Sequence, residues 1–160
     1  YYKKSLSEGG LSTPMIVSWP AGIASGSERR ITQQVAHLSD IMPTLCELSG
    51  ARYPRQFNGS SIVPIQGISL SPILKSGIIR SRAPIYWSLE QRKAMIWNDY
   101  KIIASTDQEA WKLYNLTVDR GEQVNLAAQQ PGRVAEMAKM WATWAAKIGV
   151  LNNRPSNKLE

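Results

Sequence analysis

The sequence contains only one cysteine and one histidine among its 160 residues, and this scarcity excludes several kinds of site. With Cys46 alone, the chain can form no internal disulfide and no cysteine-based metal cluster. Because apolar residues surround Cys46 in the sequence, we expect it to be a small buried side chain. The sequence has one histidine, His37, and no Asp-rich stretch of the kind that binds calcium. We therefore predict that this chain binds no metal ion by itself.

Three further patterns are missing. The sequence has no Gly-x-Ser-x-Gly nucleophile motif and no glycine-rich phosphate loop. No apolar run approaches the roughly 20 residues that a membrane-spanning helix needs. We therefore predict no membrane partner, and we do not expect the nucleophile elbow of the α/β-hydrolases or a P-loop nucleotide site.

The charge balance is basic, with 19 Lys and Arg against 12 Asp and Glu and a net charge of +7. A basic chain can bind nucleic acid, a membrane surface or a small anion. The basic residues are scattered in pairs rather than gathered in one stripe, which favours a solvated surface. We therefore predict no nucleic-acid partner. The pairs are Lys3-Lys4, Arg29-Arg30 and Arg92-Lys93.

The first half of the chain predicts one strand and two helices. Residues 15–19 form a short apolar run, which is typical of a buried strand. A helix is expected over residues 40–49, with Ser39 or Asp40 as its N-terminal cap. A second, short helix is expected within residues 67–77, with a serine cap, a proline at its first position and a glycine after its end. The apolar face of the first helix is formed by Ile41, Leu45 and Leu48.

The second half predicts a small antiparallel sheet covered by a helix. Aromatic and β-branched residues mark the strands, and Asn98-Asp99 marks a hairpin turn between two of them. The clearest helix is expected over residues 131–148, where apolar side chains recur at helical spacing and include two tryptophans. The strands are expected at residues 85–90, 94–97, 100–103 and 111–116.

Residues 3–14 carry the functional prediction. They combine two lysines, a Glu8-Gly9-Gly10 triplet and Pro14, directly before the apolar run. The two glycines predict a tight turn with backbone angles that other residues resist. A cationic loop that leads into a buried strand suits the rim of an α/β active site.

This stretch resembles the lysine–(four residues)–Glu-Gly-Gly–x–x–x–Pro segment of the type I sulfatases, the arylsulfatase family of the alkaline-phosphatase-like superfamily. Other blocks resemble the same family and follow one another in the family's order. Together they extend the resemblance over most of the chain. The further blocks are residues 37–51, 67–74, 111–116 and 119–127.

The resemblance implies an α/β fold that becomes α+β in its C-terminal half. Residues 1–80 would be the C-terminal segment of the sulfatase catalytic domain, with an edge segment of an alkaline-phosphatase-like sheet. Residues 81–151 would form a small C-terminal subdomain, an antiparallel sheet packed by a long helix. Residues 152–160 would be a disordered tail.

The resemblance also implies that the chain is the C-terminal part of a longer enzyme that hydrolyses sulfate esters, with a small-molecule or carbohydrate sulfate as substrate. That enzyme would use a formylglycine nucleophile and a divalent metal, calcium, both held N-terminal to this chain. We therefore expect the chain alone to be inactive and to need the N-terminal part of the catalytic domain as its partner. A periplasmic or secreted location is expected from the family.

Three residues are candidates for the site. Lys3 falls five residues before Glu8, where the family places its sulfate-binding lysine, so the resemblance assigns Lys3 to contact with the sulfate or the leaving oxygen. Lys4 is left out of the site. Glu8 could be an acid or base by its residue type, but in the resembling motif it is a structural residue that holds the loop, at or next to the substrate loop. His37 is either a hydrogen-bonded structural group or a residue that orients that loop.

Two alternatives stay open from the residues alone. A phosphatase or phosphonate hydrolase of the same superfamily would use a lysine loop equally well, because phosphate and sulfate present similar oxygens. A non-catalytic basic module that binds anions is the alternative from another class.

Overall fold

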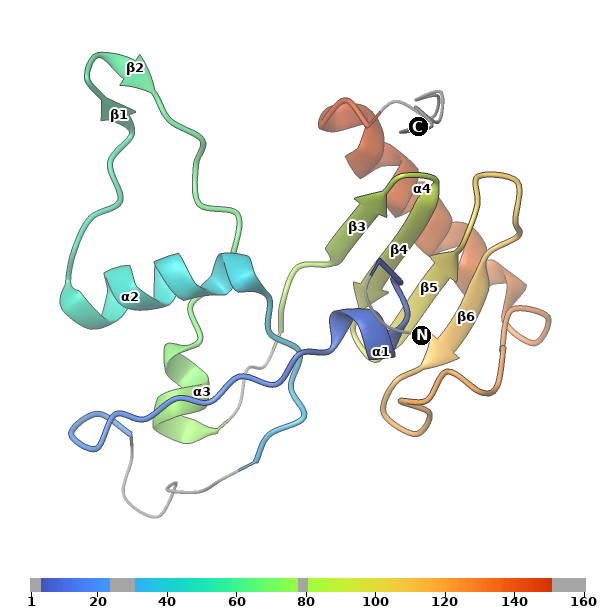
Figure 1. The fold of residues 1–160 in the computed structure, drawn as a ribbon, viewed down its shortest axis with the longest axis horizontal. Helices are drawn as coiled ribbons and strands as arrows, with labels where there is room; N and C mark the ends of the chain where they lie inside the picture. Colours follow the sequence, from blue (N-terminus) through green and yellow to red (C-terminus); the bar gives the residue numbers. More distant parts are fainter. Residues whose placement is uncertain (1–3, 24–30, 78–80, 151–160) are drawn as a thin grey trace, which may run out of the picture. The chain divides into compact units, whose positions relative to one another are not determined.

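The computed structural model describes residues 4–23, 31–77 and 81–150 (Figure 1). The chain groups into two compact units. The sheet unit joins Tyr1–Met15 to Ala83–Glu160, and the helical unit is Ile16–Arg82. Within the described residues, no helix combines the length and the apolarity needed to span a bilayer.

The predicted boundary between residues 80 and 81 stays a prediction, and the predicted tail at 152–160 lies outside the described residues. The structure adds an observation that the sequence did not suggest. The start of the chain, up to Met15, groups with the C-terminal sheet and not with the residues that follow it.

The sheet unit contains a four-stranded antiparallel sheet in the order β3-β4-β5-β6, with one long helix, α4, packed against it (Figure 1). Short turns join successive strands, so each strand pairs with its neighbour in sequence. At the Asn98-Asp99 turn, Trp97 pairs with Tyr100, and Asn98 has a φ of 53°. The predicted sheet and C-terminal helix are confirmed. Their bounds are β3 Ile85–Leu89, β4 Arg92–Trp97, β5 Tyr100–Ala104, β6 Lys112–Asn115 and α4 Pro131–Lys147.

The core of the sheet unit lies between the sheet and α4. Buried aromatic and aliphatic side chains there remove large apolar areas from water, which stabilises the unit. Trp141 also donates its indole N–H to the carbonyl oxygen of Trp87 at 3.1 Å. The predicted apolar stripe on α4 is wrong at Ile148, which follows the last helical residue and is exposed. The core cluster is Met95, Ile102, Leu113, Met137, Trp141 and Ala145.

The helical unit contains both predicted helices and one unpredicted hairpin. Gly50 and Gly77 end the two α-helices, with φ angles of 72° and 80° in the left-handed region that glycine adopts most easily. The hairpin arises where Asn58 and Gly59 both have positive φ. The elements are the 3₁₀-helix η1 Leu38–Asp40, α2 Ile41–Ser49, β1 Gln56–Phe57, β2 Ser60–Ser61 and α3 Ser71–Ser76.

The predicted strand at residues 15–19 is wrong. These residues form no strand, and Ile16 is 94% exposed. A strand needs a neighbour to accept and donate its backbone hydrogen bonds, and no described segment pairs with this one.

The predicted burial of α2 also needs correction. Ile41 and Leu45 are exposed, and the buried residue of the helix is Thr44. The Thr44 hydroxyl donates to the Asp40 carbonyl at 2.6 Å and accepts from the Leu70 N–H at 2.8 Å, so its burial leaves no polar atom unsatisfied. Cys46, expected to be buried, is a half-buried free cysteine.

Candidate functional site

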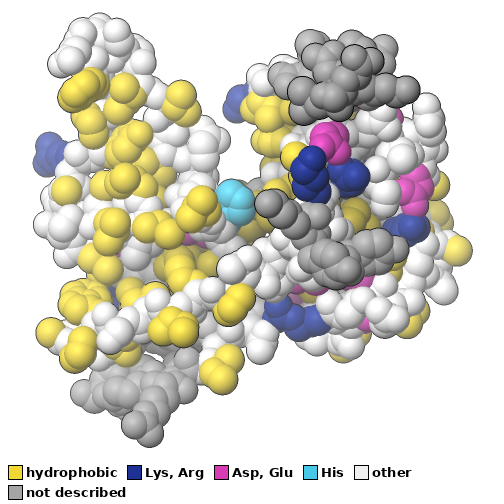
Figure 2. Space-filling model, viewed as in Figure 1, with side chains coloured by type: hydrophobic (Ala, Val, Ile, Leu, Met, Phe, Trp, Pro, Cys, Tyr) yellow, Lys and Arg dark blue, Asp and Glu magenta, His cyan; other side chains and the backbone are white. Residues whose placement is uncertain are grey.

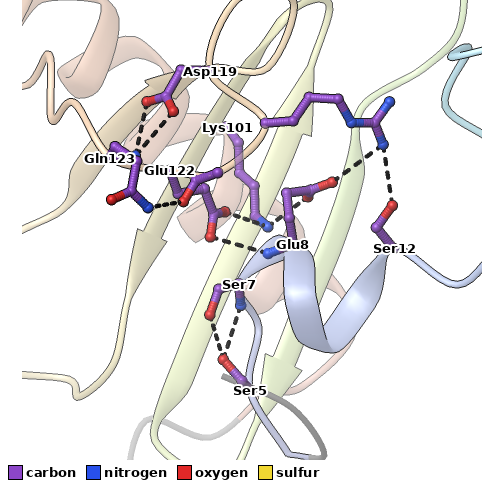
Figure 3. A network of polar contacts seen from close by, with 10 residues as sticks. Ser5, Ser7, Glu8, Ser12, Lys101, Asp119, Glu122 and Gln123 are labelled. Carbon is purple, nitrogen blue, oxygen red and sulfur yellow. Dashed lines mark hydrogen bonds and ion pairs between the residues drawn. The ribbon is translucent and has the colours of Figure 1, made fainter.

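Lys101 is the most unusual residue of the sheet unit, because it is a lysine with 0% exposure within strand β5. Successive side chains of a strand point to opposite faces of the sheet. Ile102 belongs to the core cluster with α4, so Lys101 points to the other face. The short helix α1, Glu8–Leu11, lies on that face (Figure 3).

Two carboxylates neutralise the Lys101 ammonium (Figure 3). Its Nζ donates to Glu8 Oε1 at 2.8 Å and lies in ion-pair contact with Glu122 Oε1, also at 2.8 Å. The two glutamate side chains are themselves only 13% and 9% exposed. A buried charge is tolerated when it is paired in this way.

The network also fixes the backbone of the Glu-Gly-Gly segment. The Glu8 N–H donates to Glu122 Oε2 at 3.0 Å. Glu122 therefore contacts both the Lys101 ammonium and the backbone at the start of α1. Arg120 adds contacts at the other end of the segment, with its Nη2 3.8 Å from Glu8 Oε2 and 3.2 Å from Ser12 Oγ. Residues 8–12 are therefore tied to the sheet unit by three charged side chains.

The role of glycine in this segment differs from the prediction. Among the described residues, the glycines with positive φ are Gly50, Gly59, Gly77 and Gly149, so Gly9 and Gly10 do not supply a left-handed turn. Gly10 is needed for space instead. A Cβ at this position would lie 2.2 Å from the carbonyl oxygen of Ser5.

We expect Gly10→Ala to lower the free energy of unfolding by about 1–3 kcal/mol, because the added methyl group meets the Ser5 backbone and forces the chain before α1 to shift. Chemical denaturation followed by tryptophan fluorescence measures this. Gly132→Ala in α4 is the matched control, because a Cβ there meets nothing within 4 Å and we expect no loss of stability. Equal stability of the two variants would contradict the steric role of Gly10.

A turn after β6 presents Glu122 to Lys101. Asp119 accepts backbone hydrogen bonds from Gln123 at 3.0 Å and from Val124 at 2.9 Å. Asn125 Oδ1 accepts from the N–H of Leu113 at 3.0 Å, which ties the turn to β6. Glu122 itself has a φ of 54°, a backbone conformation that non-glycine residues seldom adopt.

The backbone hydrogen bonds from Gln123 and Val124 hold the pKa of the Asp119 carboxyl below its ordinary value. A carboxyl with a lowered pKa stabilises the folded state at pH values above its unfolded pKa of about 3.9. This stability is lost as the pH falls towards the folded pKa. We expect the acid limb of the stability curve to be less steep in Asp119→Asn than in the unsubstituted chain. An NMR titration that gave Asp119 an ordinary pKa would contradict this.

A second network lies in the helical unit, around the fully buried Asp40. Its carboxylate accepts from the N–H of His37 at 2.8 Å and from the N–H of Ile68 at 3.0 Å. Arg82 donates to the same carboxylate through Nη1 at 2.9 Å and also to the carbonyl oxygen of Val35 at 2.8 Å. Asp40 therefore joins the chain around His37, Ile68 and Arg82 within this unit, well beyond the helix cap that the sequence predicted.

His37 takes the N-cap position of η1. Its Nδ1 lies 2.8 Å from the Ser39 hydroxyl, and it accepts from the Ser39 N–H at 3.3 Å. The capping box is completed by Asp40. This placement describes the hydrogen-bonded structural role that was one of the two interpretations of His37. A role in orienting a substrate loop stays a prediction.

A family model described as "N-sulphoglucosamine sulphohydrolase, C-terminal" matches residues 1–146. The chain belongs to this family. Similar sulfatases include arylsulfatase K of Xenopus laevis, which is 29% identical over 150 residues covering 87% of this chain and 27% of that protein. A sulfatase of Formosa agariphila is 27% identical over 169 residues covering 93% of this chain and 29% of that protein. The chain thus spans little more than a quarter of the length of these relatives.

Solved structures share the fold. The crystal structure of Ps i-CgsB superposes with a TM-score of 0.53 at 21% identity, over 73% of this chain and 25% of that chain. Such a likeness supports the mixed α and β architecture described above.

Of the three predicted site residues of this sulfatase C-terminal region, the structure describes Glu8 and His37. Lys3 lies outside the described residues, Glu8 belongs to the sheet unit, and His37 belongs to the helical unit. Their predicted roles near the substrate stay predictions. Sequence reasoning missed Lys101, Glu122 and Arg82. A lysine between Tyr100 and the apolar pair Ile102-Ile103 was the one local signal for Lys101, because a charge rarely interrupts a buried strand.

The residues described in this sulfatase C-terminal region do not form a metal centre. No group of three or more His, Cys, Asp and Glu side chains in the described ranges is arranged to hold a metal ion. Glu8 and Glu122 are occupied by the Lys101 ammonium, and Asp40 by Arg82. Each of these carboxylates is paired with a cation, an arrangement suited to positioning the chain.

Proposed function

We propose that this chain is the C-terminal part of an enzyme that hydrolyses sulfate esters in the manner of the arylsulfatases. The observation that carries the proposal is the match of residues 1–146 to the sulfatase C-terminal family. The Lys101 network supports it, because the network holds the Glu-Gly-Gly segment that the sulfatase motif contains.

In this proposal, Lys3 supplies a cation at the sulfate or at the oxygen that leaves as the ester bond breaks. A fixed ammonium at this position would stabilise the negative charge that develops there. Lys101, Glu122 and Arg120 are positioning residues, because they hold the backbone that follows Lys3 and do not touch the substrate. A formylglycine nucleophile and a calcium ion are expected in the rest of the enzyme.

The names of similar proteins support a proposal for the substrate class. N-acetylgalactosamine-6-sulfatase of Rattus norvegicus is 27% identical over 117 residues, covering 73% of this chain and 21% of that protein. An ulvan-active sulfatase of Formosa agariphila is 34% identical over 56 residues, covering 35% of this chain and 11% of that protein. We propose a sulfated carbohydrate as the substrate and a periplasmic or secreted location for the enzyme.

The exposed apolar side chains of the helical unit support a further part of the proposal, namely that the N-terminal part of the catalytic domain covers this unit. Figure 2 shows hydrophobic side chains over much of the visible face of the unit. Ile16, Leu38 and Leu45 are among the exposed ones. Exposed apolar groups in this number are typical of a surface that a partner covers.

The test uses the full-length enzyme that contains this chain, assayed with an aryl sulfate and with the matching aryl phosphate. We expect a clear preference for the sulfate, and a preference for the phosphate would favour the phosphatase alternative.

Lys3→Ala should lower kcat/KM by roughly 10²–10³-fold, as the loss of a transition-state contact does. Lys4→Ala is the matched control, because Lys4 pairs with Glu90 at 3.5 Å on the surface. Equal activity of the two variants would remove Lys3 from the site, and we expect no turnover from the 160-residue chain alone.

A further inference from the structure

A hollow lies on the surface of the sheet unit, between strand β3, at the edge of the sheet, and helix α4. Its volume is about 420 Å³. The floor is aromatic, because Tyr86 stacks on Trp144 with ring centroids 4.9 Å apart and planes 9° from parallel. The lining residues are Tyr86, Lys139, Met140, Thr143, Trp144 and Lys147.

Two lysines flank this floor. Lys139, Thr143 and Lys147 follow one another at intervals of four residues, so they share a face of α4, and about 12 Å of helix separates the two lysines. In the described part of the chain, neither lysine has a carboxylate within salt-bridge distance, and no acidic residue lines the hollow. Both ammonium groups are therefore available to an anion.

The combination of groups points to a ligand that is partly apolar and carries separated negative charges. An aromatic floor suits the C–H face of a sugar ring. The Thr143 hydroxyl donates to the Lys139 carbonyl oxygen at 2.9 Å and can still accept a hydrogen bond from a sugar hydroxyl. Two cations that far apart match charges on different sugar units. A nucleic acid fits less well, because its phosphates follow one another closely and call for a longer track of cations than two lysines.

We propose that this hollow is a binding site for a sulfated oligosaccharide, separate from the Lys101 network. Lys139 and Lys147 would bind sulfate groups. The stacked pair of Tyr86 and Trp144 would support a sugar ring that lies between the two lysines. The proposal does not depend on the enzymatic activity proposed above, because it concerns binding by this chain itself.

The test measures binding of a heparin tetrasaccharide to the 160-residue chain by calorimetry, at low and at physiological salt. We expect binding that weakens with salt and a roughly tenfold loss of affinity in Lys139→Gln/Lys147→Gln, because exposed charge contacts each contribute modestly. Arg52→Gln/Arg55→Gln is the control for net charge, since both arginines are exposed and lie in the helical unit. We expect this control to bind as the unsubstituted chain does. Shifts of the Trp144 indole N–H signal on titration would localise the ligand.

Four outcomes would overturn the proposal: no binding, an equal loss in the control variant, equal binding of the tetrasaccharide after removal of its sulfates, or equally tight binding of a single-stranded DNA of the same charge. Circular dichroism checks that each variant is folded. Because all four substituted side chains are exposed, we expect no change in the unfolding midpoint. Loss of sulfatase activity in the full-length enzyme is not a readout here, so failure of this proposal leaves the proposed function untouched.

Discussion

Lys101→Met is expected to lower the free energy of unfolding of the sheet unit by about 3–5 kcal/mol, which is the usual effect of removing one partner from a buried ion pair. Methionine keeps most of the length of the side chain and removes the charge. Glu8 and Glu122 would then face each other without the Lys101 ammonium between them, in a place where water reaches them poorly. Arg120 stays 3.8 Å from Glu8 Oε2, but its side chain is 46% exposed, so it offsets the repulsion between the two carboxylates only in part.

The measurement is chemical denaturation followed by tryptophan fluorescence, which reports mainly on this unit. Five of the six tryptophans belong to it, and only Trp19 lies in the helical unit. Lys112→Met is the matched control: Lys112 lies on the neighbouring strand β6, is 42% exposed and pairs with Glu109 on the surface. We expect that control to lose less than about 1 kcal/mol.

A triple variant separates charge from packing. Lys101→Met combined with Glu8→Gln and Glu122→Gln removes all three charges together, and replacing a complete buried ion network is often neutral. We therefore expect the triple variant to be more stable than Lys101→Met. If it is equally unstable, the loss comes from packing of the lysine side chain, and the electrostatic explanation is wrong.

Asp40→Asn is expected to have the second largest effect, a loss of about 3–5 kcal/mol in the stability of the helical unit. Asparagine is nearly the same size but carries no charge for Arg82, whose side chain is only 16% exposed. Its amide nitrogen also cannot accept the backbone hydrogen bonds that one carboxylate oxygen now receives. Arg82 and the N–H groups of His37 and Ile68 would share the single remaining acceptor.

Amide hydrogen exchange is the suitable measurement, because it resolves one unit from the other. Exchange at Ile68 and across α2 should become faster in Asp40→Asn. Glu47→Gln is the control in the same unit, since Glu47 makes a 4.0 Å surface pair with Lys75. Unchanged protection at Ile68 in Asp40→Asn would show that the carboxylate does not hold that segment.

The sequence determined the local structure of the C-terminal half. Alternating aromatic and β-branched residues predicted the strands, the Asn98-Asp99 pair predicted the turn, and the spacing of Met137, Trp141 and Ala145 predicted the buried face of α4. These predictions succeed because each depends on residues a few positions apart. The family resemblance was recognisable for a similar reason, since short motifs keep their spacing.

Only the tertiary structure decided what the charged and apolar residues of the first half contact. Glu8 and Lys101 are 93 residues apart in sequence, and Asp40 and Arg82 are 42 apart. No local pattern indicates that such residues meet, because residues this far apart in the sequence come into contact only when the whole unit folds. The strand predicted at residues 15–19 fails for the same reason: its apolar pattern is local, but a strand forms only where a neighbour supplies the matching hydrogen bonds.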